Sequence, residues 1–102
     1  MSGYDVSPRA EADMDEIWTF IAKRNLPAAD RMIRSFTGKF EMLSRQPLIG
    51  ESVGHLHPGL RCVIHGNYVV YYEVDSSRVT IRRIIHGARD IRQFFGPDSL
   101  DS

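Results

Sequence analysis

The sequence predicts an α+β domain in which a two-helix antiparallel hairpin packs on a small, mainly antiparallel β-sheet. Apolar residues recur at helical spacing in two segments, one that starts at Pro8 and one between Pro27 and Pro47. Three later runs, residues 60–65, 68–74 and 78–86, are rich in β-branched and aromatic residues and are separated by turn residues. The expected order is therefore β-α-α-β-β-β, followed by a short C-terminal helix or tail.

The first helix is expected to follow a short extended stretch, Gly-Tyr-Asp-Val at residues 3–6. Ser7 is suited to cap the helix, and Pro8 fits its first position because the missing N–H has no partner there. Acidic residues in the first turns favour the positive end of the helix dipole. One apolar stripe should face the core; it consists of Ala10, Met14, Ile17, Trp18 and Ile21.

The second helix is expected to restart at Pro27 and to end before Pro47. Because the link between the two helices is so short, they should form an antiparallel hairpin. The side chains of the second apolar stripe are those of Ala29, Met32, Ile33, Phe36, Phe40 and Leu43. The predicted core contains Met14, Ile17, Trp18, Ile21, Ile33, Phe36 and Phe40, with Trp18 largely buried.

Residues 47–59 read as a loop because they are rich in glycine and proline and have no period. In the strand at 60–65, alternation places Leu60, Cys62 and Ile64 on one face and Arg61 with Val63 and His65 on the other, so Arg61 is expected to point away from the core. The Arg82–Arg83 doublet interrupts the alternation of the last strand. A β-bulge and an uninterrupted strand both remain open here, as does the choice of which arginine faces the exposed side of the sheet.

Length and composition limit the classes of protein. A chain of 102 residues suits one domain, spanning 1–102, and 42% hydrophobic with 25% charged residues is ordinary for a globular protein. Thirteen basic residues balance thirteen acidic ones, and the sequence pI near 6.9 is not that of a dedicated nucleic-acid binder. We expect no stable direct DNA binding.

The same composition predicts the surroundings of the protein. No apolar run is long enough to cross a bilayer and the first residues do not resemble a secretion signal, so a cytoplasmic location is expected. Cys62 is the only cysteine, which rules out an internal disulfide and a cysteine-based metal cluster. We expect no cofactor and no metal. His55 and His57 have the His-x-His spacing of some metal sites, but they lie in a predicted loop that has no carboxylate at the spacing of a metal ligand.

Four stretches together resemble a known family. They are "YDVSPRAEADMDEIWTFIA", "LSRQPLIGE", "LHPGLRCVIHGNYVVYYEV" and "VTIRRIIHGARD", which contain a Ser-Pro-x-Ala helix start, a Pro-x-x-Gly helix end, a Gly-x-Arg strand with an aromatic hairpin, and an Arg-Ile-x-His-Gly-x-Arg-Asp ending. In this order they resemble the ParE branch of the RelE/ParE toxins of bacterial toxin–antitoxin pairs. RelE-like members are ribosome-dependent mRNA endonucleases, whereas ParE-like members are associated with poisoning DNA gyrase.

RNA cleavage without a metal needs an acid, a base and cations for the phosphate. For a nuclease, the resemblance implies Arg61, Arg83 and His86. The only lysines, Lys23 and Lys39, lie in the helical half, and phenylalanines stand in the C-terminal stretch where a catalytic tyrosine is expected. The nuclease set is therefore incomplete.

The resemblance favours a toxin that inhibits DNA gyrase by protein–protein contact, stabilises a plasmid, and is neutralised by a ParD-like antitoxin in a hetero-oligomer. A RelE-like ribosome-dependent mRNA endonuclease and a degenerate, non-toxic antitoxin partner are the alternatives. The antitoxin tail is expected to fill a groove beside the helix hairpin, with acidic residues on the C-terminal arginines. The residues expected to contact the antitoxin or the target are Arg61, Arg82, Arg83, His86, Arg89 and Arg92.

Overall fold

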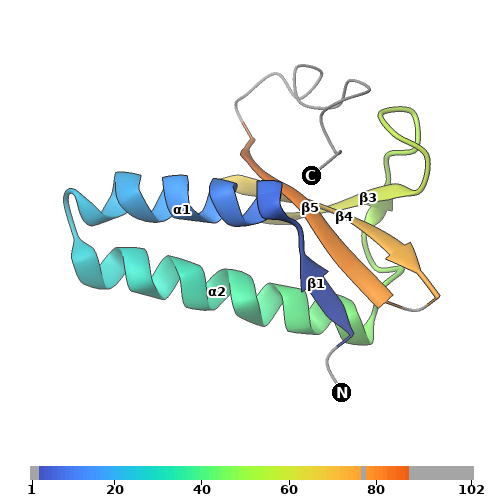
Figure 1. Ribbon diagram of the computed structural model, residues 1–102, viewed down its shortest axis with the longest axis horizontal. Helices are drawn as coiled ribbons and strands as arrows, with labels where there is room; N and C mark the ends of the chain where they lie inside the picture. Colours follow the sequence, from blue (N-terminus) through green and yellow to red (C-terminus); the bar gives the residue numbers. More distant parts are fainter. Residues whose placement is uncertain (1–2, 77, 88–102) are drawn as a thin grey trace.

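The computed structural model describes residues 3–76 and 78–87 of the chain, and these residues form two helices and five strands (Figure 1). The predicted order of elements is confirmed from the first strand to the last, with one short strand added, and the predicted C-terminal helix or tail lies outside the described residues. In chain order the elements are β1 (Tyr4–Val6), α1 (Pro8–Ala22), α2 (Leu26–Arg45), β2 (Glu51–Ser52), β3 (Leu60–His65), β4 (Tyr68–Asp75) and β5 (Arg78–His86).

The strands form one mixed sheet in the order β1-β5-β4-β3-β2. Only β1 is parallel to its neighbour, with Tyr4 opposite Val79 on β5, and the other pairs are antiparallel. The stretch expected to be a loop contains β2, a pair of residues on the edge of β3. Periodicity could not reveal so short a strand, because β2 is held only by its pairing with β3.

The first helix begins at Pro8 as predicted, and the second begins at Leu26, one residue before the predicted Pro27. The Ser7 hydroxyl accepts the backbone N–H of Ala10, and the Asn25 side chain accepts that of Ala28, so each helix has a side-chain cap. The helices form the predicted hairpin and pack on one face of the sheet, with α1 against β5 and α2 against β1 and β5 (Figure 1). No helix in the described part of the chain is long and apolar enough to span a membrane.

The main core lies between the hairpin and the sheet, and Ile17, Phe36 and Phe40 are buried in it. Met14, Ile21 and Ile33 are half-buried and pack against it. Trp18, expected to be a largely buried core residue, has intermediate burial and is not among the residues of this core. Trp18 is half-buried and its indole N–H donates to Asp30 on α2 at 3.0 Å, because its position on α1 faces the neighbouring helix near the surface and not the sheet.

A second, smaller cluster covers the opposite face of the sheet, which we call the outer face. Here Val53 and Leu60 pack with Tyr71 and Ile85. This cluster corrects the expected direction of Arg61. Leu60 and Arg61 do alternate, but Leu60 belongs to the outer face, so Arg61 shares the helix face with the half-buried Val63.

Candidate functional site

The arginine doublet on β5 contains a β-bulge. Tyr71 on β4 is paired with Arg83, whereas the next residue, Tyr72, is paired with Ile81, so Arg82 is the extra residue of the bulged strand. A bulge re-aims the side chains around it. Arg82 therefore lies on the outer face of the sheet beside Glu73, and Arg83 turns to the helix side.

Arg83 forms a two-pronged ion pair with Asp13 of α1. Its Nε and Nη2 atoms donate to the Asp13 carboxylate at 2.8 and 3.0 Å, and the backbone N–H of Ile84 donates to the same carboxylate at 2.9 Å. Arg83 is buried, with 6% of its surface exposed. β1 is too short to pair with this part of β5. Asp13 therefore accepts the backbone N–H of Ile84, which a neighbouring strand would otherwise accept.

On the outer face, Arg82 and His57 approach the same carboxylate. Arg82 Nη2 and His57 Nε2 lie 3.5 and 3.6 Å from the two oxygens of Glu73. All three side chains are partly exposed. This contact holds the loop after β2 against β4, and partly exposed pairs of this kind stabilise a fold only weakly.

Arg61 and Tyr72 fix the turn between α2 and β2. Arg61 Nη1 donates to the carbonyl of Gly50 at 2.7 Å, and the Tyr72 hydroxyl donates to the carbonyl of Pro47 at 2.8 Å. The same hydroxyl accepts the Gly50 N–H at 2.9 Å. Burial raises the pKa of Tyr72, against the lowering effects of the Gly50 hydrogen bond and of Arg61. Arg61 thus serves the fold of this turn.

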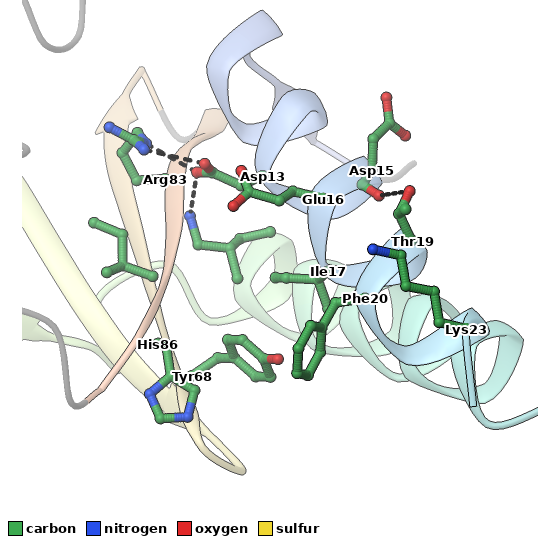
Figure 2. A pocket seen from close by; sticks show the side chains of 12 residues that line it. Asp13, Asp15, Glu16, Ile17, Thr19, Phe20, Lys23, Tyr68, Arg83 and His86 are labelled. Carbon is green, nitrogen blue, oxygen red and sulfur yellow. Dashed lines mark hydrogen bonds and ion pairs between the residues drawn. The ribbon is translucent and has the colours of Figure 1, made fainter. Parts of the chain in front are cut away.

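A groove of about 700 Å³ runs between α1 and the ends of β4 and β5 (Figure 2). We call it the α1–β5 groove. Ile17 and Ile84 line its depth, and Phe20, which is 69% exposed, stands at its rim. His86 closes one end, where its ring meets the edge of Tyr68 with the centroids 5.4 Å apart. The surface of the groove is mostly apolar, and its volume is within the range of small-molecule ligand pockets.

A second hollow of about 470 Å³ lies between the two helices, and we call it the hairpin groove. Met14 and Trp18 of α1, Ile33 of α2 and Val6 of β1 supply its apolar surface. The half-burial of Trp18, unexplained by the core, follows from its place on this hollow. Its acidic members are Glu11 and Asp15.

The remaining histidines are distributed over different surroundings. His65 lies against the ring of Phe36, with the centroids 5.1 Å apart, and its Nε2 is 2.8 Å from the Ser35 hydroxyl. Burial, and then the charge of Lys39, lower its pKa. His55 is exposed. Within the described residues no group of three or more histidine, cysteine, aspartate or glutamate side chains could hold a metal ion.

The structure does not bring the predicted contact residues onto one surface. Arg61 holds the α2–β2 turn, Arg82 lies on the outer face, and Arg83 is buried against α1. Of the residues implied for a nuclease, Arg83 and His86 both line the α1–β5 groove, whereas Arg61 lies at the α2–β2 turn. Arg89 and Arg92 lie outside the described residues.

Asp13, which holds Arg83, was missed by the sequence analysis. It stands three residues after Ala10 and four before Ile17, both buried, so it occupies the inward stripe of α1. A carboxylate on an apolar stripe needs a partner, because burying an unpaired charge is costly. The ion pair could therefore have been predicted from two observations, a carboxylate on the apolar stripe of the first helix and an arginine among the apolar residues of the last strand.

Comparison with known proteins decides the family. Residues 4–91 match the family described as the ParE toxin of the type II toxin–antitoxin system parDE. The chain belongs to the ParE toxin family. It is 34% identical over 97 residues to Toxin ParE1 of Caulobacter vibrioides, a match that covers 94% of this chain and 100% of that protein. It is 26% identical over 92 residues to Toxin ParE1 of Mycobacterium tuberculosis, covering 88% of this chain and 94% of that protein.

The ParE fold is also present in a solved structure. The chain resembles a chain of the chromosomal ParDE toxin–antitoxin system from P. aeruginosa with a TM-score of 0.71 and 19% identity, covering 84% of this chain and 96% of that one. The match to the family model starts at β1 and includes both helices and all strands. All the helices and strands described above therefore lie within the match to the ParE family.

Proposed function

We propose that this ParE toxin inhibits DNA gyrase by protein–protein contact and is not itself a hydrolytic enzyme. The proposal rests mainly on the buried ion pair between Arg83 and Asp13. The Arg83 guanidinium lies buried against the Asp13 carboxylate, where it supports the fold and is poorly placed to stabilise charge on a phosphate. Arg61 is likewise engaged with the Gly50 carbonyl. Gyrase as the target rests on the ParE family.

The target is tested with purified gyrase and plasmid DNA. Addition of the toxin should increase the amount of linear DNA released from trapped gyrase–DNA complexes by detergent and protease. Prior mixing with the antitoxin should abolish the increase. Cuts in ribosome-bound mRNA without linear DNA would instead favour the endonuclease, and the absence of growth arrest on expression without the antitoxin would favour a degenerate toxin.

His86 separates contact from catalysis within the same chain. It is exposed at the end of β5, and a nuclease would use it for proton transfer. For a toxin that acts by contact, His86→Gln should leave growth arrest largely intact, because glutamine keeps a polar group of similar reach. Loss of growth arrest with unchanged antitoxin affinity would contradict the proposal and support the enzyme.

A ParD-like antitoxin is proposed as the neutralising partner, with an apolar segment of its tail in the hairpin groove. Met14, Trp18 and Ile33 offer half-buried apolar surface there, and two carboxylates, Glu11 and Asp15, line the same hollow. The segment should therefore carry apolar anchors flanked by basic residues. Acidic residues of the antitoxin were expected to contact the C-terminal arginines. For Arg83 this expectation is withdrawn, because Arg83 is already paired with Asp13.

Trp18 reports on this groove directly, since it is the only tryptophan in the chain. Titration with the C-terminal half of the antitoxin should shift the Trp18 emission to shorter wavelength as the indole loses water. Replacement of the anchor by Ile33→Ser should weaken binding, whereas Phe20→Ser, on the other groove, is the matched control. If binding is absent at micromolar concentration, or if Phe20→Ser weakens it more than Ile33→Ser, the placement is wrong.

A further inference from the structure

The α1–β5 groove is not used by the antitoxin segment proposed above, yet it exposes apolar surface that favours an occupant. Phe20, 69% exposed at its rim, is the most exposed aromatic ring among the large apolar side chains of the described residues. Ile17 and Ile84, which line the groove, are almost completely buried. An apolar segment laid across Phe20 would remove this surface from water, which is favourable.

The charges around the groove select the chemistry of that segment. Asp13 is already paired with Arg83, and the other charged residues that line the groove are Asp15, Glu16 and Lys23, so two exposed carboxylates face one ammonium group. Figure 2 shows these carboxylates on the α1 side. The groove therefore fits a segment that combines apolar anchors with positive charge.

The chain itself continues from the end of this groove. His86 is the last residue of β5 and lines the groove, and the described residues end at Gly87. The fifteen residues 88–102 follow, "ARDIRQFFGPDSLDS". Their first half carries apolar side chains and positive charges in close succession, namely Arg89, Ile91, Arg92, Phe94 and Phe95. This is the composition that the groove fits.

We propose that the segment 88–102 of the same chain is the occupant of the α1–β5 groove, with Phe94 and Phe95 against Phe20, and with Arg89 and Arg92 beside the acidic side of α1. Phe94 follows Gly87 by seven residues, and seven extended residues span at most about 25 Å, so the tether allows Phe94 to reach beyond His86 along the groove. Because the segment is tethered at the groove, its effective concentration there is on the order of millimolar.

The consequence is that the toxin covers its own apolar groove, and a partner that binds Phe20 must first displace the tail. Occupation of the groove by the tail requires neither gyrase nor the antitoxin. It is therefore independent of the proposed inhibition of gyrase.

Disulfide trapping in the full-length chain tests the proposal. In a Cys62→Ala background, Thr19→Cys places a thiol in the groove and Gln93→Cys places one next to Phe94 without removing either phenylalanine. The matched control replaces Thr19→Cys by Gly38→Cys, an exposed α2 position with open space for a Cβ atom. Under mild oxidation at low protein concentration, the groove pair should close at least about tenfold faster than the control pair, as the local effective concentration implies.

The role of the aromatic anchors is tested in the groove pair by adding Phe94→Ser and Phe95→Ser, which should slow closure to the control rate. Circular dichroism establishes that each variant is folded. Equal closure rates for the groove and control pairs, or no effect of the two serine substitutions, would overturn the proposal. Disulfide-linked dimers as the main product would also overturn it, because the segment in the groove would then come from a second copy of the chain.

Discussion

Asp13 and Arg83, seventy residues apart in the chain, form a buried two-pronged ion pair with N–O distances of 2.8 and 3.0 Å. The pair joins the first helix to the last strand. The same carboxylate accepts the N–H of Ile84, so one side chain both neutralises a buried guanidinium and completes the edge of β5. Removing it therefore has more than one cost.

Asp13→Ala should lower the free energy of unfolding by about 3 kcal/mol or more, because it leaves the Arg83 charge buried without this partner. The double variant Asp13→Leu with Arg83→Met removes both charges and should cost less than Asp13→Ala alone. Chemical denaturation measures both. Asp5→Ala, which breaks the exposed pair with Arg78, is the control and should change stability little. If Asp5→Ala and Asp13→Ala cost the same, the buried pair does not have the role assigned to it.

Tyr72→Phe should lower the free energy of unfolding by about 1–3 kcal/mol, since it leaves the Gly50 N–H and the Pro47 carbonyl without their partner. Gly50→Ala should also destabilise, because a Cβ atom there would meet the Tyr72 hydroxyl and lie 2.8 Å from the Cys62 carbonyl oxygen. In the double variant the effects should be less than additive, as removal of the hydroxyl relieves part of the clash. Strict additivity in denaturation experiments would contradict the contact.

Trp18→Ala should cost about 1.5–2.5 kcal/mol, near half the value for a fully buried large aromatic side chain, because Trp18 is only partly buried. Phe36→Ala, at the centre of the main core, should cost about 3–5 kcal/mol. The two variants are compared by thermal and chemical unfolding. A larger loss for Trp18→Ala than for Phe36→Ala would show that the tryptophan is part of the core after all.

The free energy of unfolding should fall as the pH drops below about 6.5, the ordinary pKa of histidine, because His65 has a lowered pKa in the folded chain. The unfolded chain then binds a proton that the folded chain does not, so stability rises with pH between the lowered pKa and the ordinary one. His65→Gln should reduce this slope. His55→Gln, at an exposed position, should not. Equal slopes in His65→Gln and the unchanged protein would contradict the assignment.

Local features of the fold could be predicted from the sequence because their causes are local. Ser7 and Pro8 fix the start of α1, and turn residues bound β3, β4 and β5, whose ranges were predicted to within one residue. The faces of β3 could not be assigned in the same way. Both faces of the sheet bear apolar residues, since a second cluster covers the outer face, so alternation separates Arg61 from Leu60 but does not show which one faces the helices.

The candidate site was harder to predict for a related reason. The Arg82–Arg83 doublet indicated that the strand was irregular, but the direction of each side chain depends on partners far away in the chain, Glu73 and Asp13. The grooves depend on how α1 crosses the sheet. No periodicity within a single element contains that information.

The parallel pairing of β1 with β5 has a consequence for synthesis. Tyr4 is paired with Val79, which is made seventy-five residues later. Because β5 lies between β1 and β4, a chain interrupted before Arg78 lacks the strand that joins them, and its helices have no complete surface to pack on. Contacts so distant in sequence form late in folding. Synthesis of β5 is therefore the step after which β1 and both helices can be held in place.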